Sequence, residues 1–148
     1  MTSLYTWLKF LHLVGLAGFL FAHGISGGAS LALRGQVSTE SRRLLQLSQK
    51  SSYVAYPGLL LLLVTGIWMA FAEHLWGHGW LWASLVVLVV VFGGMGYVSR
   101  NYHLARGASS QTDDVVGTHL GRARPLLAVW IGSVGLILLI GLMVFKPF

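Results

Sequence analysis

Long apolar runs separated by polar segments dominate this chain. Four of them match or exceed the roughly 20 residues that a helix needs to cross a bilayer core, and they are too long and uncharged for strands. They cover about residues 4–33, 53–72, 80–98 (or, as a continued helix, to 106) and 125–145. Pro125 is well placed as a first-turn proline. The pattern predicts an all-α membrane protein, one domain over residues 1–148, folded as an antiparallel bundle of four transmembrane helices.

The composition excludes most soluble classes. Hydrophobic residues make up 55% of the chain and charged residues 9%, whereas soluble domains carry roughly 25% charged residues. The mean hydropathy is +0.73. There is no cysteine, which excludes disulfides, thiolate metal sites, iron–sulfur clusters and covalent c-type haem attachment.

The charges predict an orientation. The net charge is +6, and eight of the ten basic residues, four in each, lie in segments 34–52 and 100–124. The short connection between the second and third spans carries Glu73 but no Lys or Arg. The positive-inside rule therefore predicts cytoplasmic long loops and both termini outside. Because topology and contact with anionic lipid head groups explain the basic excess, we do not expect nucleic-acid binding.

Small residues mark the faces on which helices can approach closely. Gly24 and Gly28 form a G-x-x-x-G pair in the first span, and further glycines occur in the third and fourth spans. In lipid such faces pack helices together, and they can also make room for a flat cofactor. Either use fits a bundle that binds partner membrane subunits or a second copy of itself.

Two histidines in the first span are candidate ligands. His12 and His23 are eleven residues apart, which is about 1100° of helix turn and places them on one stripe roughly 16 Å apart. Ionisable groups inside a membrane are costly, so each is a functional candidate. One His towards each leaflet suits a helix that ligates haem, and interhelical hydrogen bonding is the alternative role.

A second histidine pair lies at the outer end of the second span. His74 and His78 are at i and i+4, with Glu73 beside them. If the helix continues that far, both imidazoles face one way, as in a two-His metal site, and Glu73 can support a neighbouring imidazole. Gly77 and Gly79 can instead end the helix and leave a hydrated turn.

Depth selects the expected haem ligands. His12 and His74 lie near the same membrane surface on antiparallel spans, so we expect them to be the two axial ligands of one b-type haem. His23 has no His partner at its depth unless His103 folds back, so one haem is favoured over two. His119 is expected in solvent. Arg106 and its neighbour Arg100 are expected as topology anchors, with contact to haem propionates as the alternative.

The start of the chain resembles a known superfamily. Trp7-Leu8-Lys9-Phe10-Leu11-His12 is similar to the W-x-K-x-x-H opening of the CopD/HemJ-like superfamily of bacterial four-helix integral membrane proteins. That group includes copper-resistance domains and protoporphyrinogen oxidases. The resemblance implies a bacterial inner-membrane protein and a b-type haem ligated by His12. The oxidases pair that His with a Lys in a later span, and here the later spans hold no Lys before Lys146, so a small uncharacterised relative fits better.

Three functions are consistent with these observations. The first is a membrane-embedded b-type haem protein that transfers single electrons or anchors a redox complex, with an accessory role favoured over stand-alone enzyme activity. The second is a cofactor-free structural or assembly subunit. The third is a protein that handles Cu or Zn at an outer site of His74, His78 and Glu73, with His12 as a further ligand.

Overall fold

Four long helices form the framework of the computed structural model, which describes residues 2–33 and 38–147. They are α1 (Thr2–Ala32), α2 (Thr39–Ala72), α3 (Gly79–Val98) and α6 (Pro125–Phe145). Each is long and apolar enough to cross a membrane. The described chain is otherwise completed by three short helices, and it contains no strand. These are η1 (Leu75–Gly77), α4 (Arg100–Gly107) and α5 (Asp113–Arg122). The predicted all-α, four-span architecture is confirmed.

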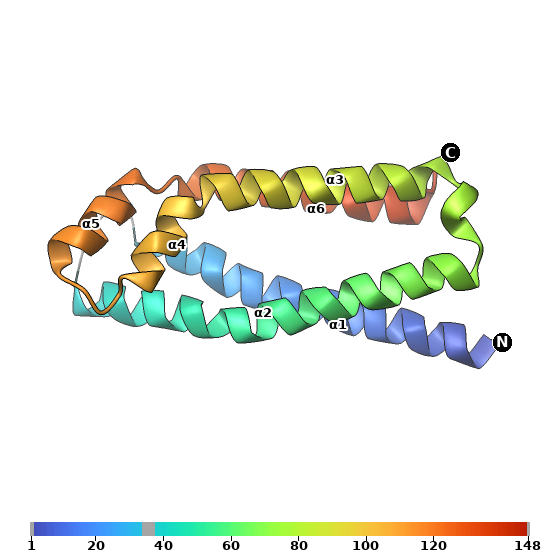
Figure 1. The fold of residues 1–148 in the computed structure, drawn as a ribbon, viewed down its shortest axis with the longest axis horizontal. Helices are drawn as coiled ribbons and strands as arrows, with labels where there is room; N and C mark the ends of the chain where they lie inside the picture. The colour runs from blue at the N-terminus through green and yellow to red at the C-terminus, as the bar shows by residue number, and fades with distance from the viewer. Residues whose placement is uncertain (1, 34–37, 148) are drawn as a thin grey trace.

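The long helices alternate in direction and pair as two antiparallel hairpins (Figure 1). Helix α2 packs along α1, and α6 packs along α3, while contacts between the two pairs are sparse. The N-terminus, η1 and the C-terminus lie at one end of the molecule, and α4 and α5 lie at the other (Figure 1). The two basic segments therefore share one end, as the charge pattern predicted.

Glycines hold α1 and α2 in backbone contact where they cross. A Cβ added to Gly15 would lie 2.8 Å from the backbone nitrogen of Leu62. A Cβ added to Gly58 would lie 2.9 Å from the backbone nitrogen of Phe19. Neither backbone atom can move without separating the helices, so glycine is required at both positions.

The second helix begins much earlier than its apolar run. Hydropathy predicted a start near residue 53, but α2 begins at Thr39. The side chain of Ser38 caps this start by accepting a hydrogen bond from the backbone nitrogen of Ser41 at 3.1 Å. The extension is stabilised by a small core at this end, in which Leu45 is fully buried. The core is formed by Leu33, Leu45, Tyr102, Ala105, Ala108, Val116 and Leu120.

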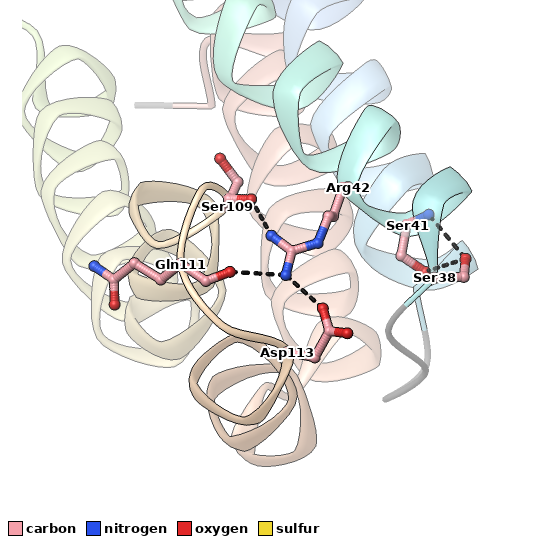
Figure 2. Close-up of polar contacts among 6 residues, drawn as sticks. All are labelled: Ser38, Ser41, Arg42, Ser109, Gln111 and Asp113. Atoms are coloured by element: carbon pink, nitrogen blue, oxygen red, sulfur yellow. Dashed lines mark hydrogen bonds and ion pairs between the residues drawn. The ribbon is translucent and has the colours of Figure 1, made fainter.

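Arg42 ties this extension to the connection between α4 and α5. Figure 2 shows its guanidinium reaching from α2 to the carbonyl oxygens of Ser109 and Gln111 and to the carboxylate of Asp113. The bond to Gln111 measures 2.8 Å. The segment between the third and fourth spans, which was expected to be a loop, thus contains two short helices, and Arg42 holds their connection in place. The expected continuation of the third span is the separate helix α4, because α3 ends at Ser99.

Candidate functional site

His12 occupies the interface between α1 and α2. Its Nδ1 lies 3.2 Å from the hydroxyl oxygen of Thr65, which is 3% exposed. That hydroxyl also lies 2.6 Å from the carbonyl oxygen of Leu61 and 3.2 Å from that of Leu62. With the hydroxyl hydrogen donated to Leu61, the Thr65 oxygen accepts from His12, and the imidazole then carries its proton on Nδ1.

This tautomer decides the chemistry of His12. A neutral imidazole protonated on Nδ1 keeps the lone pair of Nε2 free to bind a metal. Histidine ligands commonly donate their other N–H to a neighbouring oxygen, which fixes the orientation of the ring. Gly66 makes room for the ring, because an added Cβ there would lie 3.0 Å from His12 Cε1.

His23 lies on the other side of α1, towards α3 and α6. Its half-buried ring stacks on Phe19, with centroids 5.4 Å apart and planes 20° apart. Phe19 in turn stacks on Phe92 of α3 at 5.8 Å. His23 Nε2 is 4.0 Å from the point where a Cβ on Gly132 would lie, and Met95 Sδ is 3.1 Å from the same point. The ring sits among aromatic and sulfur groups, without a hydrogen bond to any described residue.

The structure does not bring His12 and His74 together. Helix α2 ends at Ala72, and His74 follows with a left-handed backbone of φ 53°. Thr65, which contacts His12, precedes Ala72 by seven residues, or about 10 Å of helix. The expected axial pair is therefore not formed in this arrangement.

His74 and His78 do not share a helical face either. They flank η1, and His78 directly precedes α3. Both side chains are exposed, as is Glu73. Within residues 2–33 and 38–147, no group of three or more His, Asp or Glu side chains is arranged to hold a metal ion. The left-handed turn at His74 explains this, because it reverses the chain where the expected site required a continuous helix.

Sequence reasoning missed two features of these sites. Thr65 is a lone polar residue in an apolar run, and that contrast was the available signal. His103 was expected at or beyond the end of the third span, but α4 turns back towards α2 (Figure 1). Partial burial lowers the pKa of His103. Electrostatic repulsion by Arg106 and His23 lowers that pKa further.

The other candidate residues lie at the α4–α5 end of the molecule. Arg106 donates to the carbonyl oxygen of Ser48 at 3.2 Å, and the Ser48 hydroxyl contacts that of Ser26 at 3.1 Å. His119 was expected in solvent, but its Nδ1 is buried without a hydrogen-bond partner among the described residues. Packing of α5 against the small core that contains Leu45 accounts for that difference.

Comparison with known proteins identifies the family. Residues 6–147 match the model of a family described as predicted integral membrane protein (DUF2269). The chain belongs to this family. No curated protein and no solved structure matches it.

The DUF2269 match spans all four long helices and includes the His12 and His23 sites. It agrees with the membrane assignment reached from hydropathy and from the helices themselves. The arrangement at His12 is the more completely built of the two sites, because a hydrogen bond to Thr65 orients its ring.

Proposed function

We propose that this chain is a membrane-embedded b-type haem protein with His12 as an axial ligand through Nε2. The role we assign is one-electron transfer, alone or as the membrane anchor of a larger redox complex. The observation that carries the proposal is the hydrogen-bond chain from His12 through Thr65 to Leu61. The resemblance of the first span to haem-binding members of the CopD/HemJ-like superfamily supports the same residue.

The residues around His12 fit an axial ligand. Thr65 holds the imidazole in the tautomer that leaves Nε2 available, and Gly66 provides space for the ring. The imidazole is half-buried between the apolar helices α1 and α2. Haem, when bound, supplies a one-electron couple, and the protein sets its ligand identity, burial and access.

The proposal assigns one protein ligand and leaves the second axial position open. His74 does not reach this depth, so it is not assigned to the same iron. The spin state of the purified protein identifies the coordination. A high-spin spectrum indicates an open position, and a low-spin spectrum indicates a second strong ligand from this chain or a partner.

Optical spectroscopy tests the proposal directly. The protein purified from haem-sufficient cells should show a Soret band, which His12→Ala should abolish and the matched control His78→Ala should leave unchanged. Thr65→Val should retain haem but raise the midpoint potential, because an imidazole without its Nδ1–H acceptor is a weaker donor to the ferric iron. A colourless preparation, or a Soret band unaffected by His12→Ala, would exclude this assignment.

A cofactor-free structural subunit is the second candidate, and one observation favours it. Gly24 and Gly28 face open space, with nothing within 4 Å of an added Cβ. The G-x-x-x-G pair therefore packs against none of the described residues and is available to a partner helix or a second copy. In this role His12 is an interhelical tie. Stoichiometric co-purification of a membrane partner that is lost in Gly24→Leu, from a haem-free preparation, would support it.

A further inference from the structure

An open groove lies where α1 and α4 meet the start of α6. It has a volume of about 640 Å³ and is lined mainly by apolar side chains. Leu126 and Leu127 form part of its wall and remain 57% and 44% exposed. Leu33, which directly follows α1, and Leu120 of α5 also line it. The volume is within the range of small-molecule sites, and the walls suit a hydrocarbon chain.

Arg124 is the charged side chain in the lining of this groove. It is exposed, and within the described part of the chain no carboxylate forms an ion pair with it. The single ion pair found there joins Arg42 to Asp113. A guanidinium that lacks an internal partner and borders an apolar wall is complementary to a ligand with an anionic head and an apolar tail.

The position of the groove selects the source of that ligand. Arg124 immediately precedes α6, the most apolar of the candidate spans. It therefore lies at the membrane surface, where phospholipid phosphates lie, and Leu126 and Leu127 lie where acyl chains begin. Both basic segments of the chain are at this end, so anionic lipids are attracted to it.

We propose that this groove binds one anionic phospholipid of the adjacent leaflet. Arg124 contacts the phosphate, and an acyl chain lies along Leu120, Leu126 and Leu127. This inference does not depend on haem binding, because the groove lies at the inner end of the bundle and shares no residue with the His12 site.

Native mass spectrometry of the full chain released from nanodiscs tests this inference. We expect one phosphatidylglycerol to be retained in preference to phosphatidylcholine. Arg124→Gln should weaken retention by about tenfold, which corresponds to loss of one charge-assisted hydrogen bond. Arg100→Gln, at the same end but outside the groove lining, is the matched control and should leave retention nearly unchanged.

A second variant blocks the groove without changing the charge. Gly121 lines the groove, and a Cβ there meets nothing within 4 Å, so the side chain of Gly121→Leu starts in open space and adds bulk to the groove. It should reduce phosphatidylglycerol retention while the circular dichroism and elution volume stay those of the parent protein. Inorganic phosphate should not compete with the lipid.

Several outcomes overturn the inference. Equal retention of phosphatidylcholine, or equal losses in Arg124→Gln and Arg100→Gln, would mean that lipid contact is diffuse. Displacement by inorganic phosphate would mean that the site recognises a free anion. Unchanged retention in a folded Gly121→Leu variant would place the lipid elsewhere.

Discussion

Thr65 determines which nitrogen of His12 is available, although Thr65 itself is buried and unreactive. Its hydroxyl lies within hydrogen-bond distance of the carbonyl of Leu61 and of His12 Nδ1. When it donates to Leu61, it accepts from Nδ1 of His12, which orients the ring and leaves Nε2 free. A single buried hydroxyl thus converts an interhelical contact into a potential ligand site.

Replacing Thr65 should therefore affect stability as well as ligation. We expect Thr65→Val to destabilise the fold by about 0.5–1.5 kcal/mol, the usual contribution of an interhelical hydrogen bond in a membrane. Thr65→Ser keeps the hydroxyl and should cost less. Unfolding in mixed micelles of increasing denaturing detergent measures both. A larger loss in Thr65→Ser than in Thr65→Val would show that packing of the Thr65 methyl group, rather than the bond to His12, is responsible.

His103 should make stability depend on pH. Because its pKa is lowered in the fold, the unfolded chain binds more protons there, and stability falls as the pH drops from about 7.5 to 5. His103→Gln should flatten this dependence, whereas His78→Gln, exposed at the opposite end, should not. Thermal unfolding midpoints across this pH range provide the measurement. An unchanged slope in His103→Gln would show that His103 is equally solvated in both states.

At the scale of the helices, close contact of α1 and α2 depends on two glycines. The attachment of α2 to the α4–α5 end depends on one arginine. Gly15 and Gly58 remove the side chains that would keep the backbones apart. Arg42 joins α2 to the connection between α4 and α5 (Figure 2). The first contact lies within the membrane and is set by shape, while the second lies outside it and is set by charge and hydrogen bonds.

Gly58→Ala should separate the first helix pair. The new Cβ would meet the Phe19 backbone at 2.9 Å, so we expect a loss of about 1–3 kcal/mol, typical of overpacking. Gly28→Ala, where an added Cβ meets open space, should be neutral or slightly stabilising through helix propensity. Thermal unfolding in detergent compares the two. A Gly58→Ala variant as stable as Gly28→Ala would contradict the close crossing.

Arg42→Gln should destabilise the connection between α4 and α5 without unfolding the long helices. The loop carbonyls at Ser109 and Gln111 lose their donor, and Asp113 loses its ion pair. We expect faster hydrogen exchange confined to residues 108–114, with protection of the long helices retained. Arg43→Gln, on the exposed neighbour, is the control. Exchange unchanged in Arg42→Gln would mean that packing against Leu45 alone holds this end.

The sequence predicted the helices better than their ends or their contacts. Hydropathy locates a span because the free energy of placing a helix in lipid depends on its amino-acid composition, which is read directly from the sequence. It missed the polar extension of α2 from Thr39, since that segment is stabilised by distant residues such as Val116. For the site, spacing identified His12 and His23 as candidates. At His74 it left a continued helix and a turn both open, and the structure has the turn, because the left-handed backbone there is a local choice that the i, i+4 spacing does not encode.

At the scale of the whole molecule, the four long helices form two hairpins, and the segment that links one hairpin to the other lies at the opposite end from α4 and α5. The connection of residues 73–78 lies beside both termini, and α4 and α5 lie at the far end (Figure 1). Combined with the positive-inside rule, this arrangement predicts that the α4–α5 end faces the cytoplasm. The bacterial inner membrane is the location we propose for it.

Thiol labelling tests this orientation cleanly, because the chain has no cysteine. In intact cells, a membrane-impermeant reagent should label Gly77→Cys in η1 but reach Gln111→Cys, between α4 and α5, only after permeabilisation. Both positions are exposed. The reverse pattern would invert the orientation, and labelling of both from one side would contradict the four-span arrangement.

The placement of both termini at one end has a consequence for gene fusion. A second copy joined through a short hydrophilic linker would enter the membrane in the same orientation as the first, with no extra span between them. Duplication of such a unit produces parallel repeats, related by an axis along the membrane normal, rather than inverted ones. Tandem fusions with one wild-type and one variant copy are therefore geometrically allowed, and they permit each copy in an assembly to be altered separately.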